Sequence, residues 1–147
     1  MVKSFMAKNI KNTKENFKQL AEEWFLKAKD DELSARDILN DREGAPSTVC
    51  FLSQQMAEKF LKGFLIYGGL EFLKIHDLEK LINLCEKTKI SFEEIRDDAR
   101  ELSAFYVATR YPGDYPQFTW SQAEKAFVSA EKIKKFVLES INSFNNG

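Results

Sequence analysis

Arg110 opens the segment of the chain whose residue types are best suited to chemistry. A planar guanidinium can grip a phosphate or a carboxylate with two parallel hydrogen bonds. Tyr111, Asp114 and Tyr115 follow directly, so two rings that can stack on a base and a carboxylate that can accept a hydrogen bond stand beside the guanidinium. These residue types suit an anion or nucleotide site, although a loop rich in proline and aromatic residues more often has a structural role at the end of a bundle. A structural ion pair, or a cation at a helix C-terminus, explains Arg110 as well.

Lys59 and His76 are two supporting candidates for this site. Lys59 belongs to a polar run at helical spacing, and such a run usually forms a solvated face. The run consists of Gln54, Gln55, Glu58, Lys59 and Lys62. His76 is the only histidine and precedes a predicted helix, where a capping or packing role is commoner than that of a general base.

Asp31 interrupts an apolar stripe that contains Trp24, Ala28 and Ala35. A buried carboxylate must be paired. Asp31 could therefore neutralise Arg110 or a lysine, or it could lie at the edge of the stripe in water. The last state is the commonest for an acidic residue, and we expect it here.

Other catalytic and metal-binding patterns are absent from the sequence. Cys50 and Cys85 stand far apart without a CxxC motif, so we expect two buried, reduced thiols and no zinc site. Glycine-rich phosphate loops and the common hydrolase motifs are missing, and Gly68-Gly69 follows a helix instead of opening one. The sequence therefore predicts no cofactor, no metal and no evident catalytic residue.

Composition limits the class of protein. The 147 residues carry a net charge of −1, with 44% hydrophobic and 31% charged residues, which suits one folded domain. The near-neutral charge argues against duplex DNA as a partner. No window approaches the roughly 20 apolar residues of a membrane span, so we expect a cytoplasmic protein with no membrane partner.

Apolar residues at helical spacing predict the elements. We expect helices from Phe17 to about Asn40, from Ser47 or Thr48 to Tyr67, from an Asp77 cap to Cys85, from a Ser91 capping box to about Tyr106, and from a Ser121 capping box to about Ile141. The fold class is all-α, an antiparallel up-and-down bundle of about five helices, four long and one short. Residues 1–16 form a frayed lead-in, and residues 17–147 form one domain.

Four segments of the chain share their order with one known family. They are Trp24 with Ala28 and Ala35; residues 50–63, CFLSQQMAEKFLKG; residues 74–78, KIHDL; and residues 106–112, YVATRYP. Together they resemble the HEPN domain (higher eukaryotes and prokaryotes nucleotide-binding), in the branch that contains RYP. The resemblance spans about Leu20 to Ile141.

The resemblance implies a helical bundle that commonly forms homodimers, is often encoded beside a minimal nucleotidyltransferase, and is linked to nucleotide binding and toxin–antitoxin systems. Many relatives are ribonucleases that use an Arg followed, after four to six residues, by a His. Arg110 corresponds to that Arg, but residues 111–117, YPGDYPQ, contain no histidine. The general acid or base is therefore missing, which favours binding over cleavage.

Three functions follow from these observations. The first is a non-catalytic protein that binds a nucleotide or RNA phosphates near Arg110 and acts with a nucleotidyltransferase partner. The second is an endoribonuclease toxin with an unidentified proton-transfer group. The third is a structural dimeric module whose Phe-rich face, drawn from thirteen Phe, docks a partner.

Overall fold

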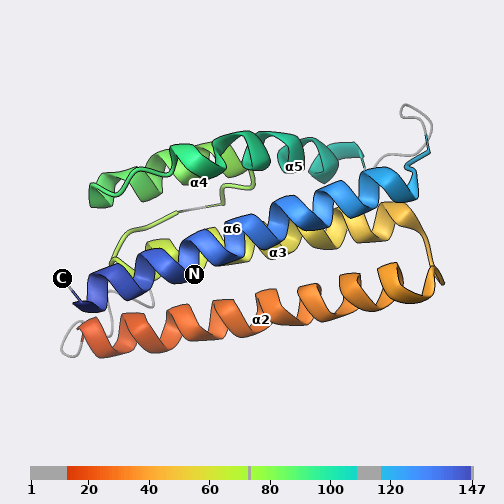
Figure 1. The fold of residues 1–147 in the computed structure, drawn as a ribbon. Helices are drawn as coiled ribbons and strands as arrows, with labels where there is room; N and C mark the ends of the chain where they lie inside the picture. The colour runs from red at the N-terminus through yellow and green to blue at the C-terminus, as the bar shows by residue number, and fades with distance from the viewer. Residues whose placement is uncertain (1–12, 73, 109–116, 147) are drawn as a thin grey trace.

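The computed structural model describes residues 13–72, 74–108 and 117–146. These residues form five α-helices: α2 (Thr13–Asp41), α3 (Pro46–Tyr67), α4 (Leu78–Cys85), α5 (Arg96–Ala108) and α6 (Trp120–Asn146). Two 3-10 turns, Glu86–Thr88 and Glu93–Ile95, link α4 to α5, and the described residues contain no strand. The all-α prediction is confirmed. The long helices run in alternating directions along one bundle (Figure 1).

Helix α3 forms the centre of the bundle. It packs against α2, α4, α5 and α6, and large side chains such as Phe60 and Phe64 are completely buried. Gly63 lets α2 approach closely, because a Cβ atom there would lie 2.3 Å from Cε1 of Phe25. Helix α3 is therefore buried on more than one face, as a helix at the centre of a bundle must be.

The helix ends agree only in part with the sequence expectations. Asp77 caps α4 as expected, since its Oδ1 accepts hydrogen bonds from the N–H groups of Glu79 at 2.9 Å and Lys80 at 3.3 Å. The Ser47 or Thr48 cap is wrong. Helix α3 begins at Pro46, with Ala45 as its N-cap. Proline suits this place because it has a helical φ and no N–H to leave unpaired.

The capping box of α6 lies two residues before the expected one. Thr119 Oγ1 accepts from the N–H of Gln122 at 3.1 Å, and Gln122 Oε1 accepts from the N–H of Thr119 at 2.8 Å. This reciprocal pair satisfies two helix-end donors, so the Ser121 box is wrong. At Ser91 a 3-10 turn intervenes, and α5 begins only at Arg96.

Phenylalanine serves the interior of the bundle. Every Phe side chain that the structure describes is buried or half-buried, and the exposed large apolar residues in the same ranges are Leu26, Leu33 and Val128. A Phe-rich docking face in these ranges would therefore consist of half-buried rings.

Candidate functional site

Four of the six predicted site residues, Arg110, Tyr111, Asp114 and Tyr115, lie outside the described residues. The other two, Lys59 on α3 and His76 just before α4, are described. Lys59 forms an ion pair with Asp31, whereas His76 lies against the carboxylate of Glu58.

His76 contacts a buried polar cluster on α3. Its Nδ1 lies 3.2 Å from Glu58 Oε2, which also accepts a hydrogen bond from Lys62 Nζ at 2.8 Å. Gln54 Nε2 donates to Glu58 Oε1 at 3.1 Å and lies 3.5 Å from the backbone oxygen of His76. The expected solvated face is wrong at these positions. Gln54, Glu58 and Lys62 are 0%, 6% and 4% exposed, whereas the His76 side chain is 45% exposed.

Two aromatic rings complete the surroundings of Lys62. Its Nζ lies 5.0 Å from the ring centre of Phe72 and 5.7 Å from that of Trp24. These two rings meet edge to face at 5.5 Å. A buried ammonium needs a counter-charge and polarisable neighbours. Glu58 and the rings supply them, and so join α2, α3 and the connector that carries His76.

Lys59 forms an ion pair with Asp31 on α2. Lys59 Nζ lies 2.6 Å from Asp31 Oδ2, and the two side chains are 23% and 16% exposed. The expectation that Asp31 lies in water is therefore wrong, because the α2 stripe carries it against α3. Since Asp31 already neutralises Lys59, this ammonium is a weaker phosphate ligand than its exposure suggests.

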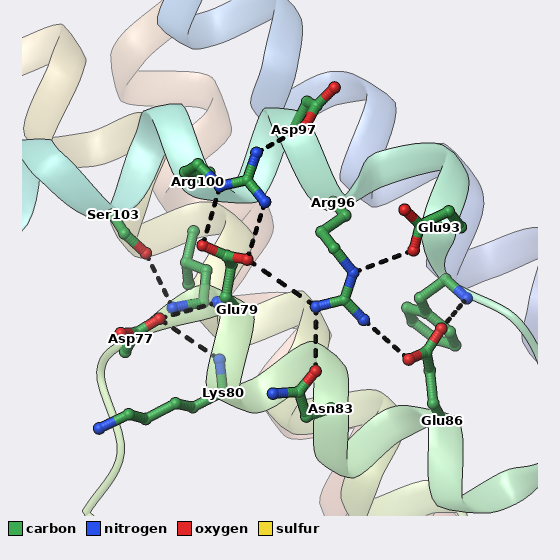
Figure 2. Close-up of polar contacts among 12 residues, drawn as sticks. Asp77, Glu79, Lys80, Asn83, Glu86, Glu93, Arg96, Asp97, Arg100 and Ser103 are labelled. Atoms are coloured by element: carbon green, nitrogen blue, oxygen red, sulfur yellow. Dashed lines mark hydrogen bonds and ion pairs between the residues drawn. The ribbon is translucent and has the colours of Figure 1, made fainter.

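Arginine side chains hold α4 against α5 (Figure 2). Arg100 forms two parallel bonds of 3.1 Å with the Glu79 carboxylate, and this hydrogen-bonded carboxylate raises the pKa of Arg100. Arg96 binds Glu86 at 2.7 Å. The N–H of Leu78 donates to Ser103 Oγ at 2.9 Å. These contacts fix the start of α4 on the helix that leads toward Arg110.

A second polar cluster joins α2 to α6. Lys134 Nζ lies 2.8 Å from Glu32 Oε2, and Arg36 lies 3.0 Å from the same oxygen. Burial and the neighbouring Glu32 carboxylate raise the pKa of Glu131 to about 7. Burial acts to raise the pKa of Glu32 too, but hydrogen bonds with Glu131, Lys134 and Arg36 outweigh it and hold that pKa below its usual value.

Thiol and metal chemistry have little support in the described part of the chain. Cys50 and Cys85 are free and buried, as expected. Burial raises the pKa of both thiols, that of Cys50 to about 11, so neither thiol forms a thiolate readily. No three His, Cys, Asp or Glu side chains in these ranges are grouped to hold a metal ion. None of the helices described here is long and apolar enough to cross a membrane.

Comparison with known proteins identifies the family. The HEPN domain model matches residues 21–141. The chain belongs to the HEPN family. A HEPN-like fold is also found in TT1696 from Thermus thermophilus, which has a TM-score of 0.73 and 30% identity over 81% of this chain and 96% of that one. ST0689, an archaeal HEPN homologue, has a TM-score of 0.66 and 29% identity over 82% and 97%. No curated protein matches the chain.

The HEPN resemblance read from four sequence segments is thus confirmed, and the structure gives two of those segments a shared role. Gln54 and Glu58 of residues 50–63 contact His76 of residues 74–78, and Lys62 binds the same Glu58 carboxylate. Sequence reasoning missed the partners that lie on other helices, such as Glu79 for Arg100. Only pairs inside one helix, such as Asp97 and Arg100 at three residues' separation, carry a visible sequence signal.

Proposed function

We propose that this HEPN protein binds a nucleotide or RNA phosphates at the segment that begins with Arg110, without cleaving them. It acts as a homodimer in the cytoplasm beside a minimal nucleotidyltransferase. The partner and the dimer rest on the family alone. The buried, reduced thiols Cys50 and Cys85 are consistent with a reducing compartment.

One observation carries the proposal, namely the link between His76 and the helix that precedes Arg110. Glu58 contacts His76. Leu78 lies two residues after His76, and its N–H donates to Ser103 Oγ of α5. Ala108 lies five residues beyond Ser103, about 8 Å along a helix. Arg110 follows Ala108 by two residues in the sequence. In this proposal one extended anion meets the side chains of both His76 and Arg110.

The chemistry of these groups favours a phosphate ligand. Arg110 offers the bidentate fork that suits a phosphate, and Tyr111 or Tyr115 offers a ring for a base. Asp114 can accept a hydrogen bond from the base or the sugar. Lys59 contributes less than expected because Asp31 neutralises it.

An endoribonuclease is the second candidate, and the contact between Glu58 and His76 favours it. A carboxylate that orients an imidazole is a common arrangement for a general base. In this version Arg110 would hold the phosphate and His76 would transfer the proton that the family's missing histidine transfers elsewhere. A cleavage assay is needed in addition to a binding assay to distinguish an endoribonuclease from a protein that only binds RNA.

Calorimetric titration tests the binding proposal. ATP, GTP and a short single-stranded RNA are titrated into the wild type, Arg110→Ala and Lys29→Ala, after circular dichroism has shown equal folding. Lys29 is exposed on α2 and controls for the lost positive charge. We expect Arg110→Ala to weaken binding at least tenfold, about 1.4 kcal/mol, and Lys29→Ala to bind like the wild type. No binding of any ligand to the wild type would overturn the proposal.

The same RNA, incubated and analysed on a gel, distinguishes the two candidates. Intact RNA that remains tightly bound supports the non-catalytic function. Cleavage that disappears in both Arg110→Ala and His76→Ala would instead establish the endoribonuclease.

A further inference from the structure

A cavity of about 700 Å³ lies at the end of the bundle where α2 begins and where α3 and α6 end. The described ends of α5 and α6 that flank residues 109–116 lie at the opposite end (Figure 1). The cavity therefore lies at the opposite end of the bundle from these described helix ends. Its volume falls in the range of small-molecule sites, roughly 300–1,000 Å³.

Gly68 lines this cavity. Its φ is −81°, which any residue adopts. A Cβ atom at Gly68 would lie no closer than 3.5 Å to its nearest neighbour, Thr88 Cγ2. Neither the backbone nor close packing thus requires glycine at this position. The neighbouring Gly69 differs, because its φ is +73° and this left-handed conformation favours glycine.

Aromatic side chains form much of the cavity wall. Tyr67 and Phe144 line it with rings stacked at 6.2 Å and an interplanar angle of 7°. The Tyr67 hydroxyl donates a hydrogen bond to Asn145 Oδ1 at 2.5 Å, which holds the end of α3 to the end of α6. Phe17 lines the cavity from α2, and its ring would lie 3.3 Å from a Cβ atom at Gly69. These rings favour a planar, apolar ligand body.

The charges at the cavity favour an anion. Lys14 and Lys18 line it and are exposed, and Glu15 is the acidic residue among the lining side chains. The C-terminal ends of α3 and α6 disfavour negative charge, whereas the N-terminal end of α2 favours it. The two lysines therefore determine the sign of the charge that a ligand of this cavity carries.

We propose that this cavity binds a small aromatic anion, whose ring packs against Phe17, Tyr67 and Phe144 and whose charged group meets Lys14 and Lys18. The inference goes beyond the proposed function, since none of the residues that line this cavity belongs to the proposed nucleotide site. A carboxylate or a phosphate can provide the charge.

Fluorescence titration with the aromatic sulfonate 8-anilinonaphthalene-1-sulfonate tests this site on the full chain. Gly68→Leu adds an apolar side chain at the wall of the cavity, and Gly68→Ala is its matched control, because the added methyl group has room. We expect Gly68→Leu and the double variant Lys14→Ala/Lys18→Ala to weaken binding at least tenfold. Gly68→Ala, Lys27→Ala and Arg110→Ala should bind like the wild type. Circular dichroism checks that each variant is folded.

Competition experiments identify which anionic group of the ligand, a carboxylate or a phosphate, the cavity binds. Displacement of the dye by indole-3-acetate but not by AMP indicates a carboxylate, and the reverse indicates a phosphate. Dye binding that is the same in the wild type, Gly68→Leu and Lys14→Ala/Lys18→Ala would overturn the inference. Failure of the Arg110 site would leave these results unchanged, so the two proposals can fail separately.

Discussion

The carboxylate of Glu58, buried on α3, lies 3.2 Å from Nδ1 of His76, which is half-exposed on the connector before α4. Glu58 also neutralises Lys62, which is 4% exposed. One side chain thus holds a buried cation and orients the only histidine of the chain. Its removal should affect stability and the position of His76 together.

Glu58→Ala should lower the free energy of unfolding by about 3 kcal/mol or more, because it leaves Lys62 buried without a counter-charge. Urea denaturation measures this value. The double variant Glu58→Leu/Lys62→Met removes both charges at similar volume and should be more stable than Glu58→Ala. Equal losses in the two variants would show that the ion pair is not the cause.

Gly63→Ala should destabilise the bundle by about 1–3 kcal/mol, because a Cβ atom at Gly63 would lie 2.3 Å from the Phe25 ring. Thermal unfolding followed by circular dichroism measures the effect. Phe25→Leu in the Gly63→Ala background should recover part of the loss. Gly68→Ala is the control and should change stability little. A stable Gly63→Ala protein would contradict this close packing of α2 on α3.

Thr119→Ala should cost about 1 kcal/mol, because it removes the capping side chain of α6. Ser121→Ala is the matched control, since Ser121 belongs to the box expected from the sequence and not to the one observed. We expect it to stay within about 0.5 kcal/mol of the wild type. If urea denaturation shows a larger loss for Ser121→Ala than for Thr119→Ala, Ser121 and not Thr119 caps α6.

Stability should fall as pH rises from about 5 to 8. The pKa of Glu131 in the folded protein is about 7, above its ordinary value of 4.5, so the folded state holds this proton more tightly than the unfolded state. The favourable contribution is complete below the unfolded pKa and is lost as pH rises through 7. Because the side chain is 34% exposed, we expect only about 1 kcal/mol after solvent screening.

Glu131→Gln should flatten this part of the stability profile, because an amide does not titrate. Below pH 4.5 the direction reverses, since the lowered pKa of Glu32 adds stability that protonation removes. Urea denaturation at several pH values measures the fall in stability above pH 5 and the fall below pH 4.5. A wild-type profile with no fall between pH 5 and 8, or the same fall in Glu131→Gln, would contradict the shared environment of Glu32 and Glu131.

The sequence predicted the helices of the fold better than it predicted the side-chain contacts between them. Apolar periodicity predicted each long helix. The role of Asp77 as the N-cap of α4 was predictable because a capping side chain binds N–H groups only two or three residues further along the chain. The pairs Lys59 with Asp31 and Lys134 with Glu32 join residues 28 and 102 positions apart, which no local pattern reveals. The solvated-face error on α3 has the same cause, because periodicity does not show that the connector with Phe72 and His76 covers that face.

The central claim is that nucleotide or RNA phosphates bind at Arg110 with His76 nearby. Amide chemical shifts of isotope-labelled protein, followed by NMR during titration with a short single-stranded RNA, test it most directly. We predict saturable shifts of the amide signals of Arg110, Tyr111, Asp114, Tyr115 and His76, and no shifts for Lys14–Lys18. In Arg110→Ala the RNA-induced shifts should be lost. Saturable shifts confined to other surfaces, or unchanged in Arg110→Ala, would contradict the account.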